Sequence, residues 1–242
     1  MIEHSANSGQ LALGVHLRDD ATFDNFLFGQ ANNALKGALS LQLDTDGEQI
    51  IYIHGLAGSG RSHLLQSACH MAEGKGCSSL YLPMEDIASM PAAEVLEGIE
   101  HLSLICIDDV DAIASNAQWE EALFHFINRA RMLNAKLLFS AGNSPSNIGI
   151  ELADLRSRLG WGLVFQIQPL VESDLAAAMK LRASGRGLML SDEVVNYIFS
   201  RSTRDISSLL ELLDTLDQAS MAEQRKLSIP FVRQYLGLDT DE

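Results

Sequence analysis

The chain has few cysteines, few basic residues and no long apolar run. Cys69, Cys77 and Cys106 are odd in number and lack the spacing of a metal site, so reduced thiols in a cytoplasmic protein fit them best. No run reaches the roughly 18 apolar residues that a membrane helix needs. The start of the chain has no basic-then-apolar pattern, so we expect neither a membrane span nor a secretory signal.

Positive charge is scarce, because 17 lysines and arginines stand against 32 aspartates and glutamates, for a net charge of -15. A protein that grips nucleic acid needs a basic face to neutralise phosphates. The composition therefore argues against direct DNA binding, and a protein of this charge that works near DNA needs a partner to hold it there. The 242 residues, 47% of them hydrophobic, suffice for one large domain or two modest ones.

The strongest motif is a glycine-rich turn that joins a strand-like apolar run, residues 51–53, to a helix-like run that starts at Leu64. It has the spacing G-x-x-x-x-G-[K/R]-[S/T]. Such a loop points backbone N–H groups at phosphate oxygens, and the N-terminus of the helix adds partial positive charge. Ser62 is placed to ligate Mg²⁺. The residues that form this motif are Gly55, Gly58, Gly60, Arg61 and Ser62. A glycine-rich turn without a ligand is the alternative.

One residue departs from the phosphate-loop pattern, because Arg61 stands where lysine is usual. Arginine keeps the positive charge and can hold phosphate with two N–H groups, but its planar fork is wider and more rigid. We therefore expect phosphate binding to be retained, whereas we do not expect fast hydrolysis.

Two carboxylates follow an apolar run at residues 102–107, which predicts a strand that is covered on both faces. In a phosphate-loop fold an acid at this strand tip orients Mg²⁺ or its water, and a second acid can polarise the attacking water. We assign Asp108 to the metal and Asp109 to the water; a strand capped by an acidic turn is the alternative. Asn143 follows the predicted strand at residues 136–140 and is either a sensor of the γ-phosphate or a turn residue.

Strands and helices alternate in the first part of the chain, and only helices follow. The pattern predicts strands at residues 51–53, 79–82, 102–107 and 136–140, and helices at residues 32–43, 62–73, 92–100 and 117–133. It then predicts helices at residues 173–184, 192–201, 204–223 and 230–236. The fold class is therefore α/β, with a phosphate-loop parallel-sheet domain followed by a small all-α lid. We divide the chain into an N-terminal segment (1–17), the α/β domain (18–169) and the lid (170–242).

Two stretches before the phosphate loop each have two interpretations. Gln10, Leu11 and Leu13 either dock as an extended peptide in an apolar pocket of a partner or form the inward face of a first strand. The phenylalanines at residues 23–28 either wall a pocket for a nucleotide base or belong to the core.

Two arginines in the second half of the chain suit an anionic ligand. Arg158 lies just before a Gly-Trp-Gly turn, where an arginine can reach into the nucleotide site of a neighbouring molecule. A solvated basic turn or a local pair with Asp154 is the alternative. Arg204 begins a lid helix and either closes over the phosphates or lies on the surface.

Taken together, these motifs resemble the AAA+ ATPases of the replication-initiator clade, and within it the Hda family, which regulates the initiator DnaA. The motifs that carry the resemblance are Arg-Ser-His-Leu-Leu in the phosphate loop, Asp108-Asp109, residues 157–162, Arg204 and residues 220–232. Three features favour Hda over DnaA: Arg61, the Gln-Leu-x-Leu segment near the start, and the lack of a DNA-binding domain after the lid in this sequence.

The resemblance implies a protein that binds ADP or ATP with Mg²⁺, attaches to the DNA-loaded sliding clamp (the β subunit) and stimulates ATP hydrolysis by DnaA. It implies a negative regulator of replication initiation with little ATPase activity of its own, cytoplasmic, and near the nucleoid only through the clamp; whether it forms a homodimer stays open. By position, Arg158 becomes the arginine finger in trans and Arg204 the lid sensor. The implied clamp contacts are Gln10, Leu11 and Leu13, and the implied nucleotide contacts are Leu27, Phe28, Asn143, Arg204 and residues 55–63.

Two departures from the family pattern matter. The clamp segment has Ala12 inside and ends at Gly14, so we expect lower clamp affinity, and Asp109 stands where active AAA+ ATPases carry glutamate. Two other functions stay open. A helicase loader or DnaA-like initiator paralogue would bind DNA in a salt-dependent manner, and a free-standing NTPase would turn over at about 1 s⁻¹ or faster without partners.

Overall fold

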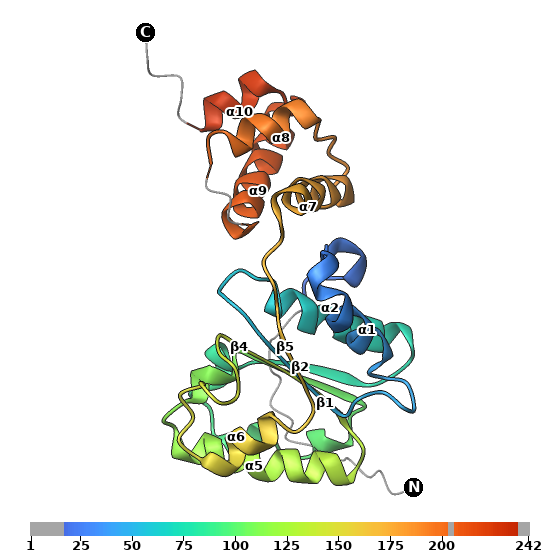
Figure 1. Cartoon of the computed structure of the whole chain (residues 1–242), viewed down its shortest axis with the longest axis vertical. Coiled ribbons are helices and arrows are strands. Elements are labelled where there is room, and N and C mark those ends of the chain that lie inside the picture. The colour runs from blue at the N-terminus through green and yellow to red at the C-terminus, as the bar shows by residue number, and fades with distance from the viewer. Residues whose placement is uncertain (1–16, 203–205, 237–242) are drawn as a thin grey trace, which may run out of the picture.

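A five-stranded parallel sheet forms the centre of the computed structural model, which describes residues 17–202 and 206–236 (Figure 1). The strand order is β2-β3-β4-β1-β5. The strands are β1 (Ile50–His54), β2 (Ser79–Pro83), β3 (Leu104–Asp108), β4 (Lys136–Ala141) and β5 (Leu163–Gln166). Because β1, β3 and β4 run parallel, their carboxyl ends share one edge of the sheet, where sheets of this kind bind their ligands.

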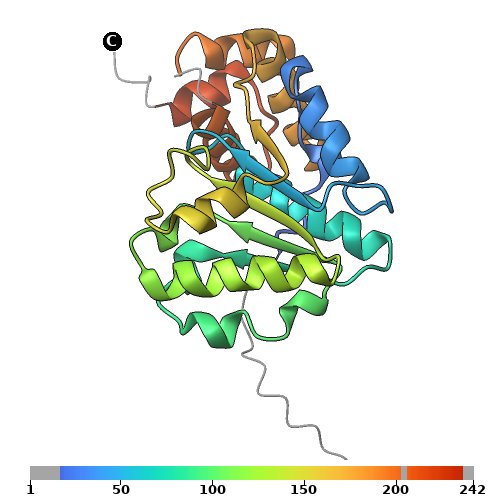
Figure 2. The same cartoon turned by 60° about the horizontal axis from the view of Figure 1, so that its bottom comes forward.

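Helices cover both faces of the sheet. One face carries α1 (Asn33–Leu41) and α2 (Arg61–Gly74), and the other carries α5 (Ala117–Met132) and α6 (Ala153–Leu159) (Figures 1 and 2). β3 reads Leu-Ile-Cys-Ile-Asp and is buried along its whole length, as a strand between two helical layers should be. The shorter elements are η1 (Phe23–Asn25), η2 (Gln30–Asn32), α3 (Met84–Ile87), α4 (Ala92–Val95), η3 (Ile99–His101) and η4 (Val110–Ile113).

The last four helices pack around an apolar core of their own. They are α7 (Glu172–Gly185), α8 (Asp192–Phe199), α9 (Ile206–Glu223) and α10 (Ile229–Tyr235). Two serines cap them: Ser191 accepts a hydrogen bond from the N–H of Val194, and Ser228 accepts one from the N–H of Phe231. None of the helices in the described ranges is both long and apolar enough to span a bilayer.

Most of the predicted elements are confirmed. The structure also contains α3, α6 and β5, which the sequence pattern did not predict, and it corrects one predicted helix. The helix predicted at residues 92–100 is wrong, because α4 is a single turn and Gly98, with φ 77°, takes the chain out of helical geometry. The sequence pattern also gives no strand at β5. This edge strand exposes both Leu163 and Val164, each 41% exposed, so it has neither the alternation nor the full burial by which a strand is recognised.

The segment before α1, which we name the lead-in (residues 17–32), is tied to the lid by ion pairs. Asp20 Oδ2 lies 2.6 Å from Nη1 of Arg182, on α7, and 3.8 Å from Nη2 of Arg186, which directly follows α7. Arg186 continues to Asp214 on α9 at 2.5 Å. Burial raises the pKa of Asp20, but Arg18, Arg182 and Arg186 together outweigh burial, so the pKa of Asp20 lies below its ordinary value.

Glu120 on α5 is a buried carboxylate that organises two loops. Its oxygens accept hydrogen bonds from the N–H groups of Ser115 at 2.9 Å, Glu151 at 3.0 Å and Leu152 at 2.7 Å. The last two donors lie where the chain enters α6. Glu120 therefore fixes the start of the helix that carries Arg158.

We expect Glu120→Ala to lower the free energy of unfolding by about 2–4 kcal/mol, because three backbone donors lose their acceptor. For a chain of this size, calorimetry should then record a melting temperature roughly 5–15 °C lower. Glu121→Ala is the matched control, since this neighbouring side chain is 75% exposed. Equal melting temperatures for the two variants would mean that the buried hydrogen bonds contribute little.

Candidate functional site

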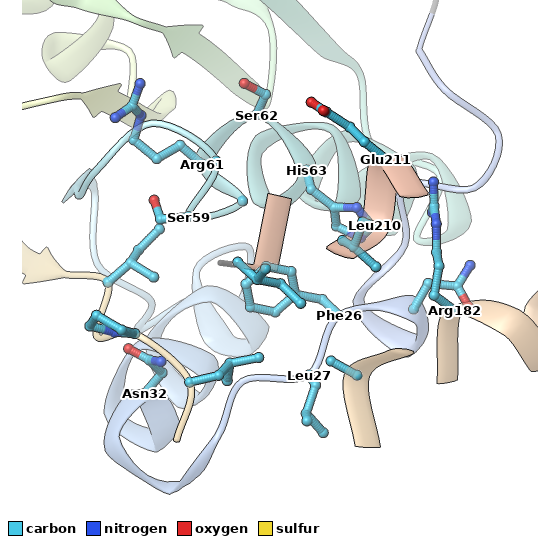
Figure 3. Close-up of a pocket in the computed structure, with 18 of the residues that line it drawn as sticks. Phe26, Leu27, Asn32, Ser59, Arg61, Ser62, His63, Arg182, Leu210 and Glu211 are labelled. Carbon is cyan, nitrogen blue, oxygen red and sulfur yellow. The ribbon is translucent and has the colours of Figure 1, made fainter. Parts of the chain in front are cut away.

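A cavity of about 360 Å³ lies where the phosphate loop, the lead-in, the β5–α7 linker and the lid meet (Figure 3). Its volume is within the range of small-molecule sites. The predicted contacts that line it are Leu27, Gly58, Ser59, Gly60, Arg61, Ser62 and His63. Because the loop leads directly into α2, the free N–H groups at the start of that helix lie at the cavity.

The other predicted residues lie elsewhere. Phe28 is 5% exposed and packs in the core beside α1 and α2, while Phe26 lines the cavity. Asn143 is exposed, and its backbone oxygen accepts a hydrogen bond from the Tyr52 hydroxyl at 2.8 Å. The loop residues outside the lining are Gly55, Leu56 and Ala57. The predicted residues that fall outside the described ranges are Gln10, Leu11, Leu13 and Arg204.

Gly60 fixes the shape of the phosphate loop. Its φ of 92° lies in the region that side chains with a Cβ rarely adopt. A Cβ at this position would lie 2.5 Å from Cε2 of Phe26, whose ring also lies 5.5 Å from the ring of His63. Glycine is therefore required here both for the backbone angle and for the approach of the aromatic ring.

Arg61 turns toward the ends of the strands. Its Nη2 donates to Oδ1 of Asp109 at 2.6 Å, and its Nη1 donates to the carbonyl oxygen of Gly55. The Arg61 and Asp109 side chains are only 14% and 19% exposed. Solvent screens such a pair less than it screens a surface pair. The arginine that replaces the usual lysine thus holds the second of the two predicted carboxylates.

Two buried polar atoms of the loop have no hydrogen-bond partner among the residues described, Ser59 Oγ and Arg61 Nε. Buried polar groups are normally satisfied, so these two atoms need an explanation. Both belong to residues that line the cavity. A phosphate group, which offers several acceptor oxygens and negative charge, fits donors of this kind.

Asp108 ends β3 and is 2% exposed. The hydroxyl of Tyr81 donates to its Oδ2 at 2.5 Å, and the hydroxyl of Ser140 donates to its Oδ1. Ser140 Oγ in turn accepts from the N–H of Asp109 at 2.9 Å. Burial raises the pKa of Asp109, the charge of Asp108 raises it further, and Arg61 only partly opposes them. Neither of the two carboxylates is among the residues that line the cavity, whereas Ser62 does line it.

His63 closes the inner end of the loop. Its Nε2 lies 2.9 Å from the carbonyl oxygen of Thr22 in the lead-in, so a neutral imidazole can donate there. Burial lowers the pKa of His63 below its ordinary value of 6.5, and the Thr22 carbonyl opposes that shift. The folded protein therefore favours the neutral ring.

This lowered pKa predicts a pH dependence of stability. The contribution of neutral His63 is complete above the unfolded value of 6.5 and declines as the pH falls from there toward the lowered folded value. We expect the melting temperature to fall less steeply from about pH 7 to about pH 5.5 in His63→Gln than in the unaltered protein. His125→Gln, at a site that is 57% exposed, controls for the loss of one imidazole. Parallel slopes in all three proteins would contradict this assignment.

Residues far apart in sequence complete the cavity, and no motif had marked them. Arg182 of α7 lines it, with a buried Nε that has no hydrogen-bond partner in the described ranges (Figure 3). Asn32 joins the lead-in to the linker, because its Nδ2 donates to Gln168 O at 3.0 Å and its Oδ1 accepts from Gln168 N at 2.9 Å. Asn32 and Gln168 are 136 positions apart, so local pattern carries no signal for their contact.

The two arginines of α6 have different environments. Arg156 is hydrogen-bonded to the backbone of the loop before α6. Its Nη1 donates to the carbonyl oxygens of Ile150 and Glu151. These bonds hold the loop before α6 in place. Nη1 of Arg156 is therefore bound to the backbone of its own chain.

Arg158 has no such backbone contact. Its Nε donates to Oδ1 of Asn128 at 3.0 Å, and its guanidinium carbon lies 3.6 Å from the centre of the Trp161 ring. No described carboxylate forms an ion pair with it, so the local pair with Asp154 is not formed. It does not line the cavity, and α6 lies on the face of the sheet opposite α2 (Figure 1).

Two family models match the chain. Residues 17–166 match the bacterial DnaA ATPase domain, which is more than half of the chain, and residues 172–236 match the lid domain of Hda. The chain belongs to the DnaA-related AAA+ family. Its lid is of the Hda type, so the predicted family resemblance is confirmed.

Solved structures of DnaA-related and other AAA+ proteins share the fold. Domain III of the replication initiation protein DnaA of Thermotoga maritima gives a TM-score of 0.80 at 20% identity, over 94% of this chain and 100% of that one. AMPPCP-bound DnaA from Aquifex aeolicus gives a TM-score of 0.72 at 21% identity, over 87% of this chain and 71% of that one. The Thermotoga maritima RuvB Holliday junction branch migration motor gives a TM-score of 0.67 at 17% identity, over 90% of this chain and 72% of that one. At these identities the likeness concerns the fold, and it confirms the α/β AAA+ class with a helical lid.

Proposed function

We propose that this DnaA-related protein binds ADP and switches off the initiator DnaA by stimulating ATP hydrolysis on DnaA. The observation that carries the proposal is the state of Arg158. It is a cation without a carboxylate partner in the described part of the chain, and it lies on the far side of the sheet from the α2 face. Such an arginine is suited to a nucleotide on another molecule. The Hda-type lid supports the same assignment.

The cavity supports nucleotide binding by this chain. The loop N–H groups, Ser59 Oγ and Arg61 Nε offer donors to phosphate oxygens. Ser62 and Asp108 are the residues that would hold Mg²⁺, which would offset phosphate charge. The described residues contain no cluster of three or more His, Cys, Asp or Glu that could hold a metal, so an ion here would depend on the phosphates. Asn143 and Arg204 complete the proposed contacts.

We infer that the chain hydrolyses its own nucleotide slowly. A water molecule is activated by a carboxylate that is free to accept its proton. Asp109 is instead bound by Arg61 at 2.6 Å. Because Arg61 neutralises Asp109, we expect the protein to bind nucleotide without hydrolysing it rapidly.

Arg158 would act on DnaA by adding positive charge beside the γ-phosphate of bound ATP. An arginine supplied in trans raises the rate of phosphoryl transfer by about 10³–10⁵. Its charge persists at any physiological pH, and its planar fork matches two phosphate oxygens. In this proposal the protein is catalytic for its partner and turns over little nucleotide itself.

Attachment to the sliding clamp is the second part of the proposal. It rests on Gln10, Leu11 and Leu13 as an extended peptide that docks in an apolar pocket. It also rests on charge, because a protein with a net charge of -15 is repelled by DNA phosphates and gains from a protein tether. Ala12 and Gly14 depart from the usual peptide, which suits a weak and reversible attachment.

The deciding experiment measures ATP hydrolysis by DnaA with clamp loaded on DNA, with and without this protein and ADP. Stimulation that requires both clamp and ADP would support the proposal. No stimulation, with DnaA and clamp each shown to be active, would favour a helicase loader or an initiator paralogue. Turnover by this protein alone at about 1 s⁻¹ or faster would favour a free-standing NTPase.

The clamp segment has its own test. We expect the double variant Gln10→Ala, Leu11→Ala to lose retention on immobilised clamp and to keep its affinity for ADP, because the described residues from Arg18 onward already supply a lined cavity with donors for phosphate. Asn7→Ala with Ser8→Ala, a change of equal size in the same segment, is the control. Unchanged retention of the first variant would return the leucines to a structural role.

A further inference from the structure

The ring of Trp161 is shared by two arginines. The guanidinium carbon of Arg158 lies 3.6 Å from the ring centre, and that of Arg131, from α5, lies 4.3 Å from it. Trp161 is 41% exposed, so this cluster faces solvent. Among the described residues no carboxylate forms an ion pair with either arginine. In a chain with a net charge of -15, two arginines thus contact the same aromatic ring.

A ring holds an arginine differently from a carboxylate. The negative face of an indole attracts the guanidinium and restricts its orientation, yet leaves its positive charge available to an incoming anion. A carboxylate would hold the side chain more strongly, but it would neutralise the charge and would compete with phosphate. The contact with Trp161 therefore orders the side chain of Arg158 and leaves its positive charge available to an anion.

Trp161 is itself well placed to act as a support. The backbone N–H of Trp161 donates to the carbonyl oxygen of Arg158 at 3.2 Å, so the two residues belong to one turn. Next to it, Gly162 packs so tightly against β1 that a Cβ would lie 1.8 Å from the carbonyl oxygen of Ile50. The ring of Phe124 lies 5.4 Å from the guanidinium carbon of Arg158. The support is thus anchored to the sheet and to α5.

We propose that Trp161 is a positioning residue for Arg158, which holds the guanidinium in a fixed, charged and outward-facing state before the partner arrives. This inference rests on the proposed function, because it assigns Arg158 a role in trans. A flexible arginine would have to be ordered during each encounter, whereas one already ordered on a ring is not. Arg131 fixes the same ring from α5 and adds a second positive charge to the surface.

The first test asks whether the contact exists in solution, independently of any partner. The chain has two tryptophans, so labelling the full chain with 5-fluorotryptophan gives two ¹⁹F resonances, and Trp161→Phe assigns them. We expect Arg158→Ala to shift the Trp161 resonance. The resonance of Trp119, which is 1% exposed, should stay in place and so reports that the fold is intact. A Trp161 resonance that does not respond to Arg158→Ala overturns the proposal.

The second test measures stimulation of ATP hydrolysis by DnaA as a function of the concentration of this protein. We expect Trp161→Ala to lower the maximal stimulation about tenfold, with the half-saturating concentration changed by less than about twofold. Trp161→Phe, which keeps a ring face for the guanidinium, should recover most of the loss. A merely structural role would instead lower stability and would alter the Trp119 resonance as well.

The outcomes separate this inference from the proposed function. Full stimulation by Trp161→Ala overturns the positioning role, whatever the resonances show. If the unaltered protein does not stimulate DnaA while its Trp161 resonance responds to Arg158→Ala, the proposed function fails, and the ordering of Arg158 by Trp161 is supported as a property of the chain.

Discussion

Arg158→Ala should reduce the stimulation of ATP hydrolysis on DnaA by on the order of 10³-fold or more, because it removes the charge supplied in trans. Affinity for ADP should stay unchanged, since Arg158 does not line the cavity. The fold should also persist, because the variant loses a partly exposed hydrogen bond to Asn128 and a ring contact. Single-turnover hydrolysis of ATP already bound to DnaA measures the first quantity, and titration calorimetry with ADP measures the second.

Arg129→Ala is the matched control for this experiment. Arg129 lies on α5 and pairs with Glu100 at 3.1 Å, with 46% of its side chain exposed. Arg129 is thus already paired with a carboxylate of its own chain, so the variant should stimulate DnaA as well as the unaltered protein does. If Arg158→Ala loses ADP affinity, Arg158 belongs to the chain's own nucleotide site, and the role in trans is wrong.

Gly60→Ala should weaken ADP binding about 10- to 100-fold, because a left-handed backbone costs alanine about 1–2 kcal/mol and the Phe26 ring must also move. The added Cβ would lie 2.5 Å from Cε2 of that ring. The ring packs 4.8 Å from Phe28 and 5.5 Å from His63, so it cannot move alone. Titration calorimetry with ADP measures the loss.

Gly37→Ala provides the comparison for Gly60→Ala. Gly37 lies in α1, and a Cβ there would meet nothing within 4 Å. Alanine favours the helix over glycine, so this variant should be slightly more stable and bind ADP as before. Equal ADP affinity in the two variants would remove the phosphate loop from the nucleotide site.

The phosphate loop could be predicted from the sequence because its determinants are local. A strand-like run, glycines at turn positions and a helix-like run lie within fifteen or so residues, and together they fix the geometry. The same holds for β3, whose apolar run ends at Asp108. The structure gives Gly58 and Gly60 the positive φ angles that such a loop requires. Only the chain's own backbone is involved in these features.

Other features depend on contacts that no local pattern encodes. Arg61 and Asp109 are 48 positions apart, and the sequence predicts each to face a ligand, whereas the structure pairs them with one another. Which phenylalanine of the lead-in faces the cavity was equally hidden, because that segment is irregular and has no periodicity to follow. In the structure Phe28 packs in the core, and Phe26 lies at the phosphate loop.

The ion pairs of Asp20 make the attachment of the lid depend on the solution. At physiological ionic strength, charges are screened over about 8 Å, and screening acts most on pairs that water reaches. Asp20, with 38% of its side chain exposed, is such a case, whereas the apolar cores are not affected by salt in this way. Acid weakens the same ion pairs. Their contribution to the free energy of unfolding is complete above the ordinary pKa of 3.8, and it is lost as the pH falls through the lowered pKa of Asp20. Salt can therefore weaken the attachment of the lid, and so the affinity for a nucleotide, while the phosphate loop itself stays unchanged.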